Sequence, residues 1–317
     1  MVLSAVQDRL APLQAWLFPR RVYLELQDQA ITAMVLAGRR LQWCETLPLP
    51  EGVVVAGEPL RPEALGDLIG DWLLERGYGG ARVRAVLPWR ASAWRLLQWP
   101  AGSSGQPLRQ LLAAQADALA LDWPLEQLDL QLLPLADPDS ALLLAAPLAL
   151  LEAWISVFAQ AGLGLDGLEA AGVCGLRALA DPSDRLLLLC EAGQSWLLCL
   201  QAGEPQWQWP LPPLAQPAAL LEALEPCLAH WQRRVPELRA RPLQVLGTAA
   251  TTAAAADDDH DALLALQAQL QTRGPGGAAL VDPLAQSWLQ PMLEGRGCPP
   301  GAALALLWGL AAAELQP

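Results

Sequence analysis

Two segments in different halves of the chain share one pattern, and this internal repetition limits the possible folds more than any other feature. Each segment contains an apolar run, a short polar turn, a second apolar run, an Ala-Gly turn and a third run that reaches a Gln-Trp pair, and the two occupy residues 21–43 and 185–207. Three short apolar runs separated by turns are typical of a three-stranded meander. A meander used twice predicts a duplicated architecture. Chance similarity is the alternative, because few residues are identical between the copies.

Helical and extended patterns alternate along the rest of the chain. Apolar residues at helical spacing predict helices over residues 62–76, 108–121, 148–161, 217–232, 261–271 and 301–315. Short apolar or alternating runs predict strands over residues 83–87, 92–99, 128–133, 141–146, 243–246 and 279–281. Residues 51–61 are rich in Pro and Gly and predict a loop without strand pairing. This order is that of a mixed α/β protein.

The length and hydrophobicity fit a soluble protein of two halves. A chain of 317 residues with 53% hydrophobic residues can form about two domains, and Asp181–Asp184 is the predicted boundary. The longest apolar stretch, 141–165, is interrupted by Pro147 and Glu152, which favours a strand and a helix over a membrane span. Residues 1–18 lack the features of a secretory signal and predict a docking helix, with a membrane-surface helix as the alternative.

The charge of the chain narrows its possible chemistry. The net charge is −13, from 33 acidic and 20 basic residues, and every basic residue is Arg. Without Lys, Schiff-base catalysis and the lysine-dependent phosphate loop are excluded. A strongly acidic chain is also a poor ligand for nucleic-acid phosphates. We therefore predict no nucleic-acid partner.

Cysteine and histidine give little sign of a metal or catalytic centre. The six cysteines include no Cys-x-x-Cys pair and mostly lie in apolar runs, which favours reduced, buried thiols. The acidic cluster Asp257–Asp261 contains His260 and could bind a divalent cation, but it precedes a predicted helix, where carboxylates cap amide groups. His230 has no partner at ligand spacing. We predict no metal site and no catalytic residue.

A tryptophan array is the strongest candidate for a binding surface. Trp89, Trp94 and Trp99 recur every five residues, and Arg95 is one of three arginines interleaved with them. Such an array can pack in a core or at an edge, hold an extended peptide, or stack on nucleic-acid bases. The acidic balance of the chain disfavours nucleic acid, so core packing and a peptide groove are the two main interpretations.

Several short motifs, in a shared order, give the chain from Arg21 onward a resemblance to a known family. They are the stretches 47–58, 83–88 and 141–163, the turn Val281–Leu284 and the Ala- and Leu-rich helix at 300–310. In this order they resemble PilM, a cytosolic component of the type IV pilus inner-membrane platform, and its relatives MshI of mannose-sensitive pili and the cytoplasmic part of GspL in type II secretion. The resemblance implies a two-lobed actin-like fold, which is a duplicated ribonuclease H-like fold, with an inserted subdomain of the FtsA/PilM type.

The same resemblance implies a plan of domains. Residues 1–20 would form an N-terminal extension, residues 21–182 a first lobe and residues 183–317 a second lobe. The inserted subdomain would occupy about residues 83–133, and the outer subdomain of the second lobe would be shortened at about residues 213–242.

The phosphate-binding motifs of the family are only partly present. Its first meander turn reads Asp-Ile-Gly-Ser-Ser-x-x-x-Lys and holds phosphate and magnesium, whereas the matching residues here run from Glu25 to Gln29 without Gly, and Thr32 stands at the Lys position. Gln27 adds a side chain where backbone amides would approach a phosphate. Glu191 and Gly193 stand in the second turn for Asp-x-Gly, and Gly247 remains of an adenosine-side Gly-Gly-Gly. We expect a pseudo-ATPase, with no cofactor beyond a vestige of ATP and Mg²⁺ binding.

The resemblance also implies partners and a location. The chain would be a cytosolic scaffold that binds the N-terminal tail of a PilN-like single-pass inner-membrane protein, contacts PilB/PilT-type motor ATPases, and reaches the membrane only through partners. Oligomers, twitching motility and DNA uptake belong to the same expectation. Trp89, Trp94, Arg95 and Trp99 are the predicted peptide-contacting residues. An active actin-like ATPase and a GspL-like type II secretion subunit are the alternatives.

Overall fold

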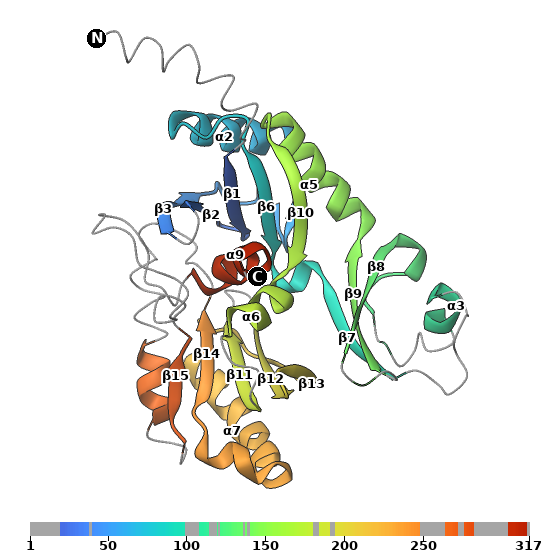
Figure 1. The fold of residues 1–317 in the computed structure, drawn as a ribbon, viewed down its shortest axis with the longest axis vertical. Helices are drawn as coiled ribbons and strands as arrows, with labels where there is room; N and C mark the ends of the chain where they lie inside the picture. Colours follow the sequence, from blue (N-terminus) through green and yellow to red (C-terminus); the bar gives the residue numbers. More distant parts are fainter. Residues whose placement is uncertain are drawn as a thin grey trace.

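Two lobes, each built on a five-stranded sheet, make up most of the computed structural model (Figure 1). The structure describes residues 20–37, 40–98, 108–113, 119, 121–135, 137, 140–179, 184–190, 194–247, 264–271, 276–281 and 304–315. A smaller, three-stranded sheet projects to one side of the lobes. One predicted meander is found in each lobe, so the duplicated architecture is confirmed.

The first lobe contains β1 (Arg21–Leu26), β2 (Ala30–Ala37), β3 (Arg40–Pro48), β6 (Arg82–Leu87) and β10 (Gly164–Ala170), in the sheet order β10-β6-β1-β2-β3. β1 pairs antiparallel with β2 and parallel with β6. Helices α2 (Pro62–Glu75) and α5 (Leu148–Gln160) pack against each other. Leu65, Ile69 and Leu73 of α2 recur every four residues and are buried, as an amphipathic helix on a sheet requires.

The second lobe contains β11 (Arg185–Cys190), β12 (Ser195–Gln201), β13 (Glu204–Leu211), β14 (Leu243–Gly247) and β15 (Ala278–Leu280), in the order β13-β12-β11-β14-β15. β11 pairs antiparallel with β12 and parallel with β14, which repeats the arrangement of the first lobe. Helix α7 (Pro217–Arg234) and the helical residues 264–271 contribute Leu220, Leu224 and Leu266 to the core of this lobe.

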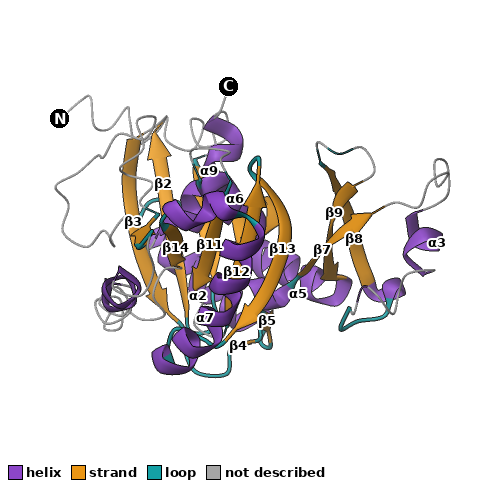
Figure 2. Ribbon diagram, turned by 90° about the horizontal axis from the view of Figure 1, so that it is seen from below, coloured by secondary structure: helices purple, strands orange, loops and turns teal. Residues whose placement is uncertain are grey.

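The small sheet consists of β7 (Ala93–Gln98), β8 (Leu128–Pro134) and β9 (Ser140–Pro147), in the order β7-β9-β8, with helix α3 (Leu108–Ala113) beside it. Figure 2 shows this unit standing apart from the two large sheets. The predicted insertion at about 83–133 differs from this sheet at both ends. β6 belongs to the first lobe, because its apolar run pairs with β1 and β10, and β9 belongs to the small sheet.

Helices α6 (Ala171–Ala178) and α9 (Ala305–Leu315) lie between the lobes and pack closely (Figure 1). A Cβ atom at Gly309 would lie 1.8 Å from the carbonyl oxygen of Cys174, so only glycine permits this contact. Trp308 of α9 is fully buried in an apolar cluster that also contains Leu187 and Leu246 of the second lobe and Met34 of the first. One continuous core therefore joins the lobes.

The structure corrects the sequence-based elements in three places. The predicted loop 51–61 contains a short hairpin, β4 (Val54–Val55) with β5 (Glu58–Pro59), whose turn uses positive φ angles at Ala56 and Gly57. Strand β10 and helix α6 were not predicted, because their residues show neither a clear alternation nor a long helical stripe. The third strand of each meander continues beyond Trp43 and Trp207.

Three short 3-10 helices complete the described elements: Trp89–Ala91, Leu125–Gln127 and Pro236–Ala240. The predicted helix at 1–18, the acidic cluster at 257–261 and most of the boundary at 181–184 lie outside the described residues. Within the described part of the chain, no helix is long and apolar enough to cross a bilayer, and no cluster of three potential metal ligands occurs.

Candidate functional site

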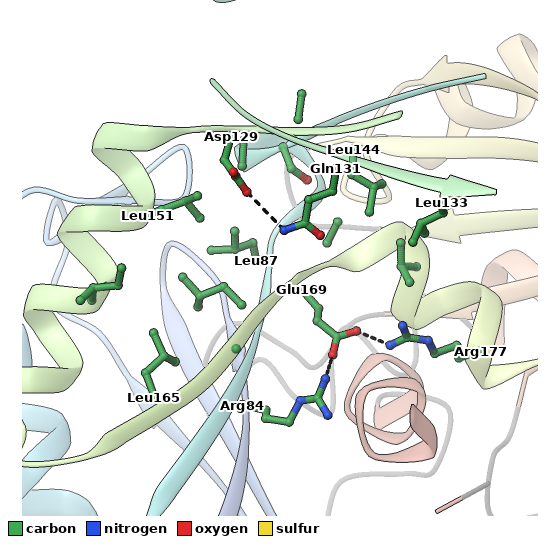
Figure 3. Close-up of a pocket in the computed structure, with 18 residues that line it drawn as sticks. Arg84, Leu87, Asp129, Gln131, Leu133, Leu144, Leu151, Leu165, Glu169 and Arg177 are labelled. Carbon is green, nitrogen blue, oxygen red and sulfur yellow. Dashed lines mark hydrogen bonds and ion pairs between the residues drawn. The ribbon is translucent and has the colours of Figure 1, made fainter. Parts of the chain in front are cut away.

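A cleft of about 450 Å³ lies where the small sheet meets the first lobe (Figure 3). One wall is a face of the small sheet, and the opposite wall is formed by β10 and α5. Its lining residues are Arg84, Leu87, Ser92, Asp129, Gln131, Leu133, Leu144, Ala145, Ala146, Leu151, Ile155, Leu165, Gly167, Leu168, Glu169, Ala170, Val173 and Arg177.

Helix α5 presents an apolar stripe toward this cleft. Leu151 and Ile155 line the cleft, and Leu148 lies one turn earlier on the same side of the helix. Ile155 is 52% exposed and Leu148 is 39% exposed. Contiguous exposed apolar surface is a common feature of binding grooves.

The opposite part of the cleft is polar, and its charges are paired. Glu169 of β10 accepts hydrogen bonds from both Arg84 and Arg177, as Figure 3 shows. Arg84 also donates to Glu314 of α9 at 2.7 Å. Burial raises the pKa of Glu314, but hydrogen bonds from Arg84 and Tyr23 outweigh it, so its pKa lies below the ordinary range. These contacts connect the cleft to the helix between the lobes.

The edge of the first sheet borders the same cleft. β10 is the terminal strand of that sheet in the described residues, so one side of its backbone has no strand partner there. Gly167 lines the cleft, and a Cβ atom at this position would meet nothing within 4 Å. On the facing wall, Gln131 donates a hydrogen bond to Asp129 at 3.2 Å. The cleft thus combines an unpaired strand edge, open space and an apolar helix face.

The turn of the first meander has a different arrangement. Glu25 and Gln27 are buried, and the Gln27 amide donates to the Glu25 carboxylate at 3.1 Å. The Asp28 carboxylate accepts hydrogen bonds from two backbone N–H groups of the β4–β5 hairpin, including that of Gly57 at 2.9 Å, and pairs with Arg90. The side chains of this turn therefore bind one another and the hairpin.

In the second meander, Glu191 and Gly193 lie outside the described residues. Gly247, the last residue of β14, lies beside Cys190 in the sheet. Burial raises the pKa of Cys190 to about 12, so its thiol stays protonated at neutral pH. Of the five predicted cofactor residues, the structure therefore describes three. Glu25 and Gln27 lie at the turn after β1, and Gly247 lies at the end of β14.

The predicted peptide-contacting tryptophans occupy the core between the lobes. Trp89 is 5% exposed and stacks on Trp196 of the second lobe, with ring centroids 5.0 Å apart, and Trp94 packs edge-on at 4.7 Å. Arg95 donates to the carbonyl oxygens of Trp94 and Leu119. Trp89 and Trp94 thus serve core packing, and neither lines a groove wall.

Trp99 lies outside the described residues. The groove residues were missed because β10 was not predicted, although the Leu148, Leu151 and Ile155 spacing was visible in the sequence.

The fold is similar to that of a chain in the PilM–PilN type IV pilus biogenesis complex, with a TM-score of 0.67 and 20% identity over 94% of this chain and 99% of that one. The cytoplasmic domain of EpsL, an inner-membrane component of the Vibrio cholerae type II secretion system, gives 0.49 and 13% over 93% and 95%. The ethanolamine utilization protein EutJ from Carboxydothermus hydrogenoformans gives 0.46 and 13% over 93% and 89%. No family model and no curated protein sequence matches the chain.

The chain has an actin-like fold. The similarity to the pilus protein extends over both lobes and the small sheet, since nearly the whole of each chain is covered. The fold-level expectation from the sequence motifs is therefore confirmed.

Proposed function

We propose that this protein is a cytosolic scaffold of a type IV pilus or related inner-membrane assembly platform. It binds the cytoplasmic tail of a PilN-like membrane protein in the cleft between the small sheet and the first lobe, and links that protein to the motor ATPase. The observation that carries the proposal is the cleft itself, in a chain whose fold matches that of a chain from the PilM–PilN complex over almost its entire length.

The shape and chemistry of the cleft favour an extended peptide. An added strand can form main-chain hydrogen bonds with the unpaired edge of β10. Apolar side chains of the peptide would cover Leu151 and Ile155 of α5. The cleft carries both signs of charge, with Arg84 and Arg177 already paired to Glu169, so apolar contact and strand pairing contribute more to affinity than charge does.

In this proposal the protein does not turn over ATP. The residues of the first turn do not fit a Mg²⁺–phosphate group, because the Asp28 oxygens are occupied by backbone N–H groups and by Arg90. Gln27 is held against Glu25, and a side chain stands where a phosphate site needs glycine. The stack of Trp89 on Trp196 fills space between the lobes. We therefore assign no catalytic step to this region.

The decisive experiment is a fluorescence anisotropy titration with a labelled peptide that has the N-terminal tail sequence of the PilN-like protein encoded in the same genome. Wild-type protein should bind it, and Ile155→Asp should weaken binding by about tenfold or more, because a carboxylate would be placed against the apolar peptide face. Leu74→Asp is the matched control, since Leu74 is 64% exposed on α2 and does not line the cleft.

Absence of peptide binding, or equal losses for the two variants, would contradict the cleft assignment. Calorimetry with Mg-ATP tests the other half of the proposal, and micromolar binding with hydrolysis would instead support an active ATPase.

A further inference from the structure

The second lobe contains an aromatic pocket with a basic rim, and none of its lining residues lines the proposed peptide cleft. The pocket has a volume of about 350 Å³ and lies between β13 and the end of α7. Its walls include Gln201, Gln206, Trp207, His230, Trp231 and Arg234.

An irregularity in β13 turns two adjacent side chains toward this pocket. Trp207 pairs with Cys199, but Pro205 pairs with Leu200, so Gln206 is an extra residue without a partner on β12. A β-bulge of this kind redirects side chains, and Gln206 and Trp207 both line the pocket. β13 is also the terminal strand of its sheet in the described part of the chain. An edge strand, a bulge and a pocket therefore coincide.

Trp207 and Trp231 form the aromatic wall of the pocket, and Trp209 adjoins it through its contact with Trp207. Trp207 stacks on Trp209 with centroids 5.1 Å apart and contacts Trp231 at the same distance. Trp209 is 45% exposed, which leaves much of one aromatic surface open to solvent. Trp231 is only 7% exposed, so its ring supports Trp207 from inside the lobe.

The rim of the pocket is basic in a chain whose net charge is −13. His230 and Arg234 line the pocket, and Arg233 lies beside them at the C-terminal end of α7. The Arg234 guanidinium lies 5.9 Å from the Trp231 ring centroid, and neither it nor Arg233 forms an ion pair within the residues that the structure covers. A cationic ligand is disfavoured by Arg234. An uncharged proline-rich ligand would leave Arg234, the arginine that lines the pocket, without a carboxylate partner.

We propose that this pocket binds a short acidic peptide segment of a partner protein. A large apolar or aromatic side chain of the segment packs against Trp207 and Trp209, and its carboxylates face Arg234 and His230. The unpaired edge of β13 supplies main-chain hydrogen bonds. This site is independent of the cleft in the first lobe, so either assignment can fail without the other.

Selection from a phage-displayed library of random short peptides on the intact protein tests the proposal. Peptides that bind here should combine several Asp or Glu residues with a large apolar residue. Their affinity, measured with synthetic labelled copies, should fall about tenfold or more in Arg234→Glu and in Trp209→Ala, and should decrease with added salt. Arg233→Glu is the matched control, because it makes the same charge change outside the pocket lining. Its effect should stay within about twofold.

Peptides lost through Ile155→Asp belong to the cleft and are counted separately. The proposal is overturned if no enriched peptide depends on Arg234, or if the dependent peptides are neutral, proline-rich or basic. It is also overturned if Arg234→Glu abolishes self-association in sedimentation experiments while no peptide binds, since the surface would then contact a second copy of the chain.

Discussion

The two lobes contain the same meander, but individual arginine and tryptophan side chains near it differ in pairing and exposure. In the first lobe, Arg82 and Arg84 are paired with carboxylates, and Trp89 is buried against the other lobe. In the second lobe, Arg234 is exposed and outside any ion pair of the described residues, and Trp209 is nearly half exposed. The comparison shows that one topology can serve internal cohesion in one copy and leave side chains free for external contacts in the other.

The largest difference in stability should appear when one buried and one partly exposed tryptophan are each replaced by alanine. Trp89→Ala removes a buried indole and its stacking on Trp196, so we expect the free energy of unfolding to fall by about 3–5 kcal/mol. Trp209→Ala removes a ring that is 45% exposed, and the loss should stay below about 1 kcal/mol. Urea unfolding followed by circular dichroism measures both values. Equal losses would remove the distinction between a cohesive and an exposed tryptophan cluster.

A smaller loss of stability is expected from a substitution at the contact between α6 and α9, where the lobes join. Gly309→Ala would place a Cβ atom 1.8 Å from the Cys174 oxygen, which must push α6 and α9 apart, and should cost about 1–3 kcal/mol. Gly175→Ala is the matched control on α6, because its Cβ would meet only the side chains of Leu306 at 3.7 Å and Leu246 at 3.8 Å, which are ordinary contact distances. The control should be neutral or stabilising by up to about 1 kcal/mol through helix propensity. Comparison of melting temperatures measures the difference, and similar losses for both variants would argue against the close crossing.

The smallest expected effect is a loss of stability at acid pH. Hydrogen bonds from Arg76 lower the pKa of Glu45, and a hydrogen bond from Arg82 lowers that of Asp166. Because these carboxyls titrate at lower pH in the folded state than in the unfolded state, their stabilisation is present at neutral pH and is lost as the pH falls below about 4. The first lobe should therefore lose amide protection before the second lobe as acid is added, which hydrogen exchange with mass spectrometry can follow.

Substitution separates this effect from general acid sensitivity. The double variant Glu45→Gln with Asp166→Asn should show a flatter dependence of unfolding free energy on acid pH than the wild type. Asp71→Asn, which changes an exposed carboxylate on α2, should leave the dependence unchanged. If the control flattens the curve as much as the double variant does, the paired carboxylates are not responsible.

Periodicity predicted most elements of the fold because each lobe buries regular apolar faces. The meander strands and helices α2, α5 and α7 lie within a few residues of their predicted bounds. β10 and the β4–β5 hairpin were missed for local reasons. β10 is interrupted by a register shift between Leu165 and Gly167, and the hairpin turn depends on positive φ angles, including one at Ala56 that residue type does not indicate.

The candidate sites were predicted less well, because a site depends on which elements meet. The spacing of Trp89 and Trp94 allowed core packing or a peptide groove, and in the structure the two rings pack on each other while Trp89 stacks on Trp196 of the second lobe. Trp207 and Trp231 are far apart in sequence, and only the packing of α7 on β13 brings them into one pocket.

The amino-acid sequence alone determined the two meanders and the apolar stripe of α5, since each depends on neighbouring residues along one element. Its composition excluded lysine chemistry, because the chain contains no Lys. Tertiary structure alone decided which tryptophans are buried, that Asp28 binds a hairpin, and that β10 and the small sheet enclose a cleft. The physical reason is that burial, hydrogen-bond partners and cavities arise between elements distant in sequence, where local patterns carry no information.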